Sequence, residues 1–269
     1  MANCDESTTT GVRRAQEEWG TVITVDVRDA IDERAVDACY AWFRRVDELF
    51  STWRPDTEIM RIVAGTLAVE EASPEVGHVL QLCEDMRLES HGAFDVAVGA
   101  HPDVPRRLGF APLDPSGLVK GWAVGQAAIL LREWGAENFF ITAGGDLVAF
   151  GRPDTSAPGW RVGVQHPWDR DRVAAVLEVS GRAVATSGAY ERGEHVFDPR
   201  TGRPVSGLAS VTVVGPDLAV ADAYATASMV LGPDAGLRWL QTRVGYEGLA
   251  ITDDHVVLTT PGIDRYRCS

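Results

Sequence analysis

The stretch RAVATSGAYERGEHVFDPRTGRP, from Arg182 to Pro204, combines a strand pattern with small, charged and turn-forming residues. RAVA predicts a short strand, and the flexible backbone of Thr186-Ser187-Gly188 lets a ligand approach closely. His195 and Asp198 follow in HVFDP, and Thr201-Gly202 predicts a turn. The stretch fits a binding site that contains His195 as well as it fits a decorated β-hairpin with a hydrogen-bonded histidine.

Short strand patterns surround this stretch. WRVGVQ begins at Trp160, VAAVLEV at Val173 and SVTVVG at Ser210, and the chain closes with GLAIT and HVVLTT as a hairpin. Closely spaced strands without a helix between each pair are typical of antiparallel sheets and not of a βαβ alternation. The sequence therefore predicts an α+β fold.

Helices and further strands precede and follow this region. Apolar residues recur at helical spacing in 32–50, 73–90, 118–134, 222–231 and 233–244, which predicts five helices. Alternating residues predict a strand at 21–27, and NFFITAGGDLVAFG predicts two strands that meet at Gly144-Gly145.

The composition is that of a globular protein. The chain has 269 residues, of which 45% are hydrophobic and 24% charged, so it can bury a substantial core. We expect a disordered tail at 1–16 and a single domain at 17–269. The net charge of −14 argues against binding to nucleic acid. A phosphate-bearing ligand would need a metal ion, backbone amides or a few well-placed cations.

The cysteines and the first residues bear on location. Cys4, Cys39, Cys83 and Cys268 lie far apart, which suggests neither a zinc site nor a disulfide framework. The first residues contain no apolar segment of the kind found in a signal peptide or lipoprotein leader, and no window is apolar enough for a transmembrane helix. These features predict a cytoplasmic protein.

Two short patterns carry chemistry. Asp222 and Thr226 in ADAYATA are four residues apart, so both side-chain oxygens would project from one helix face and suit magnesium. The helix that follows LDPSG has Gly117 and Lys120 near its start, where free amides favour an anion. Each pattern has an ordinary alternative, because Asp222 could cap a helix and LDPSG could be a routine loop. Asp146 is likewise explained equally well as a turn residue.

Several blocks together resemble the ApbE family of FAD:protein FMN transferases. They are STWRPDTEI at Ser51, GAFDVAVG at Gly92, LDPSGLVKGWAV at Leu113, AGGDLVAFG at Ala143, TSGAYERGEHVFDPRTGRP at Thr186, SVTVVG at Ser210 and ADAYATA at Ala221. The resemblance spans residues 19 to 260 in the order of the family. It implies a T-fold-like α+β architecture in which FAD lies in a cleft between lobes, with Mg2+ beside its diphosphate.

The resemblance also implies roles for individual residues. Trp19 occupies a flavin-site position that is usually methionine, and Trp53 a position that is usually tyrosine. The other implied FAD contacts are Ala93, Phe94, Asp95, Asp114, Lys120 and Val196. The implied metal ligands are the Gly117 carbonyl and the side chains of Asp222 and Thr226. His195 matches the histidine required for transfer.

The implied reaction is magnesium-dependent transfer of FMN from FAD to a threonine or serine hydroxyl of a partner protein, with release of AMP. The acceptor segment would resemble D-x-x-T/S-G-A-T. Two other functions stay open: hydrolysis of FAD to FMN and AMP, and binding of FAD without turnover. Binding without turnover is disfavoured by the presence of Asp222, Thr226 and His195, because a pure binding protein would not need these residues.

The chain departs from the family in three ways. The segment 96–112 is much shorter than usual, and Gly125 stands where the family has aspartate. No lipoprotein signal is recognisable before the domain. We therefore expect the acceptor to be a cytoplasmic protein or the inner face of a membrane protein.

Overall fold

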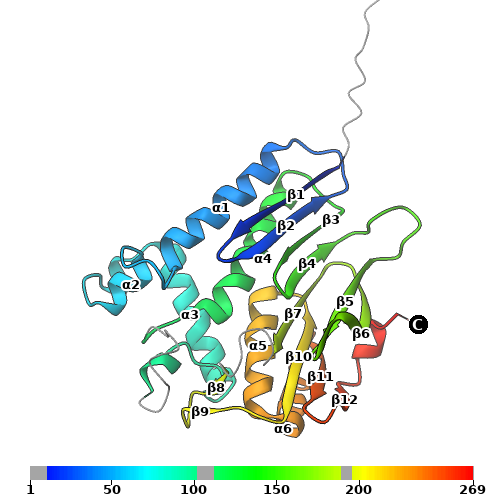
Figure 1. Ribbon diagram of the computed structural model, residues 1–269. Helices are drawn as coiled ribbons and strands as arrows, with labels where there is room; N and C mark the ends of the chain where they lie inside the picture. Colours follow the sequence, from blue (N-terminus) through cyan, green and yellow to red (C-terminus); the bar gives the residue numbers. More distant parts are fainter. Residues whose placement is uncertain (1–10, 102–111, 189–195, 269) are drawn as a thin grey trace, which may run out of the picture.

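The structure is a computed structural model that describes residues 11–101, 112–188 and 196–268 (Figure 1). His195 therefore lies outside the described residues, as do most of the shortened segment 96–112 and residues 1–10 of the expected tail.

An eight-stranded antiparallel sheet forms the centre of the molecule, as the sequence predicted. Its strands are, in spatial order, β1 (Val12–Glu18), β2 (Thr21–Val27), β3 (Phe139–Ala143), β4 (Asp146–Phe150), β7 (Arg182–Gly188), β10 (Leu208–Gly215), β11 (Glu247–Thr252) and β12 (Val257–Thr259). Every pair of neighbours in this order is antiparallel.

Two small ribbons lie outside this sheet. β5 (Trp160–His166) pairs with β6 (Asp169–Val179), and β8 (Phe197–Asp198) pairs with β9 (Arg203–Pro204). Of the described residues in the expected strand HVFDP, only Phe197 and Asp198 are in a strand.

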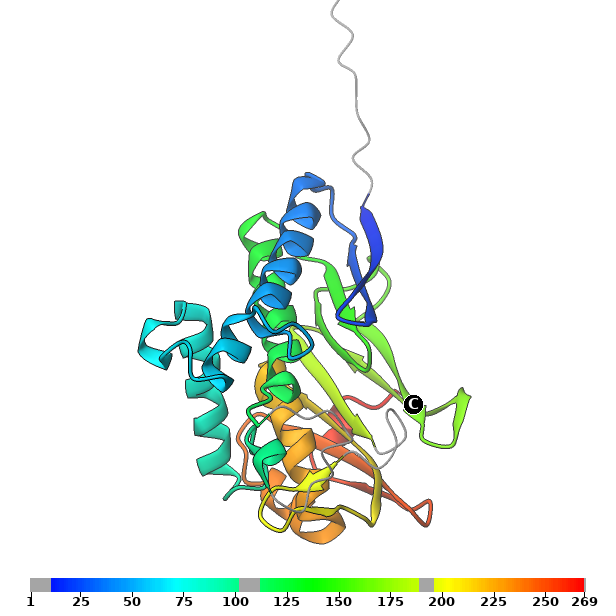
Figure 2. The same cartoon turned by 60° about the vertical axis from the view of Figure 1, so that its left-hand side comes forward.

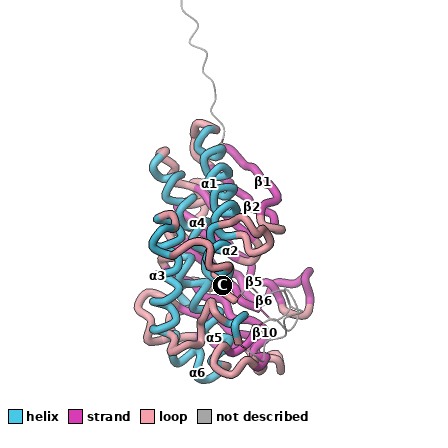
Figure 3. The backbone as a smooth tube through the Cα atoms, turned by 90° about the vertical axis from the view of Figure 1, so that its left-hand side faces the viewer, coloured by secondary structure: helices cyan, strands magenta, loops and turns pink. Residues whose placement is uncertain are grey.

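The helices cover one face of the sheet. They are α1 (Arg34–Phe50), α2 (Glu58–Val63), α3 (Pro74–Glu89), α4 (Ser116–Glu133), α5 (Leu218–Leu231) and α6 (Pro233–Leu240), with single 3-10 turns η1 (Val69–Glu71), η2 (Val98–Ala100) and η4 (Ile263–Arg265). Figures 2 and 3 show the helices gathered on one side of the strands. α5 packs on β7, β10 and α4, and α1 packs on α4. Within the described ranges, no helix is long and apolar enough to cross a membrane.

Strand alternation divides the core between the two faces of the sheet. On β3, Ile141 points into the cluster under the helices, whereas Phe140 packs against the cluster on the opposite face. The second cluster lies under the β5–β6 ribbon and includes Trp160 and Leu177. One face of the sheet therefore carries helices and the other a two-stranded ribbon (Figure 3).

Three boundaries differ clearly from expectation, and one of them is the end of α6, which lies at Leu240 and not at Val244. Residues 12–16, which we expected in the disordered tail, form most of β1, because pairing with β2 stabilises a charged strand whose own pattern is weak. α5 begins at Leu218 and not at Asp222, since the Oδ1 atom of Asp217 accepts a hydrogen bond from the Val220 amide, 3.0 Å away.

Gly121 permits the close approach of α4 and α5. A Cβ atom at this position would lie 2.7 Å from the Leu218 carbonyl oxygen and 3.0 Å from the Ala219 Cα. At Gly125, one helical turn later, a Cβ atom would meet nothing within 4 Å. The two glycines thus lie in the same helix, but only Gly121 lacks room for a side chain.

We predict that Gly121→Ala destabilises the protein by about 1–3 kcal/mol through overpacking. Gly125→Ala is the matched control, and it should raise stability by up to about 1 kcal/mol because alanine favours a helix. Urea denaturation of both variants measures the difference. Equal effects would contradict a tight contact between α4 and α5 at Gly121.

Candidate functional site

The candidate site lies at the end of the sheet where the β1–β2 and β3–β4 turns meet. Strands β2 and β3 pair with Ile23 opposite Ala143, which places the two turns side by side. A Cβ atom on Gly144 would lie 3.5 Å from the Thr21 hydroxyl oxygen. The start of β4, the end of β7 and parts of α4 and α5 reach the same end.

Lys120 of α4 joins two carboxylates there. Its ammonium forms an ion pair with Asp146, the first residue of β4, and lies 4.0 Å from the Oδ2 atom of Asp222 on α5. Asp146 is fully buried, and its Oδ1 atom also accepts a hydrogen bond from the Thr186 amide at 3.1 Å. These contacts between charged groups connect α4 and α5 to the sheet.

Asp222 and Thr226, which the sequence analysis expects to bind a metal, both lie in α5, one turn apart. Asp222 lies in the second turn of the helix and is 5% exposed, while Asp217 provides the cap. The capping alternative for Asp222 is therefore wrong. One turn later, the Thr226 hydroxyl lies 3.0 Å from the Ser187 hydroxyl at the end of β7.

The donor atoms around Asp222 suit a hard cation. They are carboxylate and hydroxyl oxygens from Asp222, Thr226 and Ser187, with the Asp146 carboxylate on the other side of Lys120. Magnesium accepts such oxygen ligands when the substrate's phosphates complete the set. Among the described residues, no group of three or more His, Cys, Asp or Glu side chains is suited to a metal.

The segment after α3 lies against the start of α4. Phe94 is 4% exposed, and its Cε2 atom would lie 3.6 Å from a Cβ atom at Gly117. Ala93 is buried as well, with 1% of its surface exposed. The side chain of Asp95 accepts a hydrogen bond from the Ala97 amide at 2.8 Å.

Asp114 stabilises the beginning of α4. Its Oδ1 atom accepts a hydrogen bond from the Ser116 amide at 3.0 Å, and its amide donates to the Val96 carbonyl at 2.8 Å. The first turn of α4, which contains Gly117, is thereby fixed beside the segment that contains Phe94.

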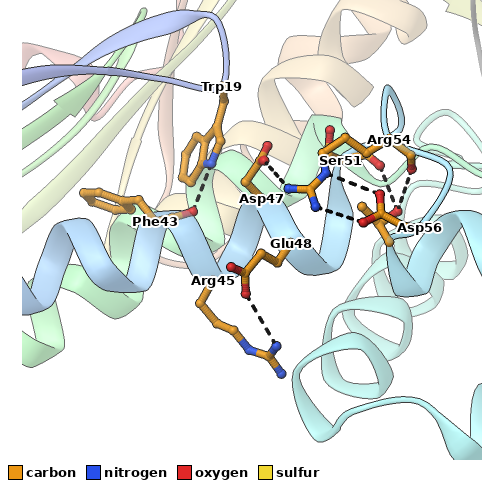
Figure 4. A network of polar contacts seen from close by, with 9 residues as sticks. Trp19, Phe43, Arg45, Asp47, Glu48, Ser51, Arg54 and Asp56 are labelled. Carbon is orange, nitrogen blue, oxygen red and sulfur yellow. Dashed lines mark hydrogen bonds and ion pairs between the residues drawn. The ribbon is translucent and has the colours of Figure 1, made fainter.

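Trp19 and Trp53 differ in the contacts of their side chains and in their exposure to solvent. The Trp19 indole donates to the Phe43 carbonyl at 3.1 Å and meets the Phe43 ring edge-on, so it is tied to α1 (Figure 4). Trp53 is 86% exposed, and in the described part of the chain it makes no ring contact or hydrogen bond through its side chain. The structure thus brings Trp19 into the fold and leaves Trp53 open to solvent.

The loop that carries Trp53 is nonetheless stiff. The Arg54 guanidinium lies between Asp47 of α1 and Asp56, with N–O distances of 3.4 and 3.0 Å (Figure 4). The buried Thr57 hydroxyl caps α2 and donates to the Ser51 carbonyl at 2.9 Å. These contacts explain the pattern STWRPDTEI.

Val196 is the first described residue after the segment that contains His195. It is half-buried against the main core, and its carbonyl accepts from the Val205 amide at 3.0 Å. The Asp198 carboxylate accepts a bidentate pair from the Arg200 side chain and one hydrogen bond from the Arg200 amide, and these bonds lower the pKa of the Asp198 carboxyl. The expected turn at Gly202 is confirmed by its positive φ of 66°.

Asp146 and Ser187 are site residues that sequence reasoning did not assign. Asp146 follows two glycines, which favours a turn, but the structure buries it as the partner of Lys120. The sequence signal that could have identified Asp146 as a site residue is a carboxylate at the first position of an apolar strand. Ser187 belongs to the Thr186-Ser187-Gly188 segment that the sequence marked as open to a ligand, but its contact with Thr226 was not predictable, because Thr226 lies 39 residues away.

Fold and site together define an antiparallel α+β protein in which a partly exposed lysine pairs with a buried carboxylate beside an oxygen-rich helix face. Residues 19–109 and 106–250 match the ApbE family, and the chain belongs to that family. A relative from Klebsiella pneumoniae called FAD:protein FMN transferase is 28% identical, over 93% of this chain and 88% of its own length. One of the same name from Rhodobacter capsulatus is 30% identical, over 90% of this chain and 56% of its own length.

The fold agrees with solved structures of this family. The flavin transferase ApbE from Vibrio cholerae superposes with a TM-score of 0.81 at 25% identity, over 95% of this chain and 99% of that structure. The expected α+β class and family membership are therefore confirmed. The roles of the individual site residues stay predictions.

We predict that Lys120 and Asp146 are energetically coupled. A double-mutant cycle of Lys120→Met and Asp146→Asn, followed by urea denaturation, should give a coupling energy of about 1–3 kcal/mol because one partner is fully buried. The exposed pair Arg87–Glu84 is the control, and its cycle should give less than about 1 kcal/mol. Coupling no larger than that of the control would contradict a structural role for the buried pair.

Proposed function

We propose that this protein transfers the FMN moiety of FAD to a threonine or serine hydroxyl of a partner protein and releases AMP. The observation that carries this proposal is the convergence of Lys120, Asp222 and Thr226 at one end of the sheet, in a chain that belongs to the ApbE family. The relatives' name, FAD:protein FMN transferase, supports the same reaction.

FAD would lie across the end of the sheet. The residues proposed to contact FAD are Trp19, Trp53, Ala93, Phe94, Asp95, Asp114, Lys120 and Val196. The stiff loop around Trp53 presents an exposed indole that suits stacking on a planar ring. Lys120 would supply a positive charge to the diphosphate in a protein of net charge −14.

Magnesium is the proposed metal cofactor. Asp222, Thr226 and the Gly117 carbonyl would hold it, and the oxygen donors described above fit this metal in type. When bound, it would offset the diphosphate charge and make AMP a better leaving group. The ion pair with Asp146 keeps Lys120 beside the same oxygens and restricts the motion of its side chain.

The transfer step is a substitution at the FMN phosphorus. The acceptor hydroxyl oxygen forms a bond to that phosphorus, and the phosphoanhydride bond to AMP breaks, with its electron pair leaving on AMP. We propose that His195 takes the hydroxyl proton, because imidazole titrates near neutral pH. Water in place of the hydroxyl would give FMN and AMP, which is hydrolysis.

Mass spectrometry separates the two reactions. The protein is incubated with FAD, magnesium and a short synthetic peptide that contains Asp-x-x-Thr-Gly-Ala-Thr. A peptide that gains FMN supports transfer, whereas free FMN and AMP with an unmodified peptide would support hydrolysis and contradict the proposal. A cytoplasmic acceptor, as expected from the sequence, stays a prediction.

We predict that His195→Gly lowers transfer by roughly 100-fold or more, the contribution typical of a general base. FAD affinity, measured by quenching of flavin fluorescence, should stay unchanged. His255→Gly is a matched control, because His255 is exposed and its φ of 68° already suits glycine. Transfer retained by His195→Gly would rule out this role for His195.

A further inference from the structure

The two outer edges of the β5–β6 ribbon differ. The edge of β6 is covered by the C-terminal segment, because the Glu178 amide donates to the Tyr266 carbonyl at 2.6 Å and the Cys268 amide donates to the Val176 carbonyl at 2.9 Å. β5 pairs with β6 alone among the described strands. Within the described ranges, the other edge of β5 is therefore an unpaired strand edge.

The pairing register identifies the groups on that edge. Val176 and Glu178 direct their backbone groups to the C-terminal segment, so Leu177 and Val179 direct theirs toward β5. Leu177 is opposite Val162, and Val179 is opposite Trp160. Arg161 and Gly163, which alternate with these residues, consequently present their N–H and C=O groups to the open edge.

A hollow of about 340 Å3 lies along this edge. Phe140, Leu147 and Ala149, on the sheet face opposite the helices, contribute apolar surface to its lining. Four consecutive β5 residues, 160–163, line it together with Gln165. Neighbours in a strand point to opposite faces, so consecutive lining residues mean that the backbone edge itself borders the hollow.

The hollow extends to the candidate site. Gly144, Gly145 and Thr186 also line it, and the Thr186 amide donates to the buried Asp146 carboxylate that pairs with Lys120. A chain that follows β5 along the hollow would reach the β3–β4 turn, one residue from Asp146.

Charge indicates what kind of chain fits. Arg161 lines the hollow and is exposed, and within the described ranges it forms no ion pair. An exposed cation without a salt bridge is a feature that attracts an acidic residue, here in a protein of net charge −14. Open N–H and C=O groups above an apolar floor favour an extended peptide.

We propose that an extended, acidic segment of the acceptor protein binds as an added strand on the β5 edge, and that this brings its hydroxyl residue to the candidate site. This inference rests on the proposed function. Backbone hydrogen bonds to Arg161 and Gly163 supply affinity, and the Arg161 side chain selects an acidic residue.

Two substitutions of Arg161 separate these contributions. Arg161→Ala removes the charge and should lower kcat/KM for the Asp-x-x-Thr-Gly-Ala-Thr peptide roughly two- to fivefold. Arg161→Pro also removes the outward N–H, which an edge strand tolerates, and should lower kcat/KM roughly three- to tenfold more. FAD affinity, measured by fluorescence, should be unchanged in both. Equal kcat/KM values for the two variants would overturn the added strand.

Hydrogen exchange on the unaltered protein gives an independent test. A saturating concentration of the peptide should slow exchange of the Arg161 and Gly163 amides, while the Val162 amide, already bonded to β6, should not change. Unchanged exchange at 161 and 163 would overturn the inference even if the peptide gains FMN. If the peptide gains no FMN but the two amides are protected, the docking surface stands and the proposed transfer fails.

Discussion

The ion pair between Lys120 and the buried Asp146 is the interaction on which the site depends. It joins α4 to the first residue of β4, and the 4.0 Å approach to Asp222 extends the cluster to α5. A buried carboxylate is costly unless it is paired and hydrogen-bonded, and Lys120 and the Thr186 amide satisfy both needs. Any displacement of α4 would therefore leave an unpaired charge inside the protein, which explains why a polar site is held rigidly.

Packing makes that geometry possible. α4 and α5 approach closely at Gly121, where a side chain would collide with the Leu218 carbonyl. This contact lies one residue from Lys120 and four from Asp222 in their helices. Asp217 caps α5 and fixes where that helix begins, so Asp222 and Thr226 face the end of the sheet. A steric constraint and a cap thus set the positions of the charges.

Local sequence patterns predicted much of the fold but only part of the candidate site. The spacing of Asp222 and Thr226 predicted a shared helix face, and alternation predicted β2 and the β3–β4 hairpin. Asp146 was missed because its partner Lys120 is 26 positions earlier in the chain, and no local pattern encodes their contact. β1 was missed for a similar reason, since its strand conformation depends on pairing with β2. His195 lies outside the described residues, so its assignment still rests on the resemblance to the family.

The two faces of the sheet divide the work that a protein-modifying enzyme has to do. The helix face supplies charged groups and oxygen donors, which require burial and rigid support. The opposite face supplies an open strand edge, which requires exposure so that another chain can pair with it. Gly144-Gly145 and Thr186 lie where both faces end. The Thr186 amide donates a hydrogen bond to the Asp146 carboxylate on the helix face, while Thr186 itself lines the hollow on the opposite face. A single residue of the sheet, Thr186, thus connects the hollow beside β5 to the carboxylate that pairs with Lys120.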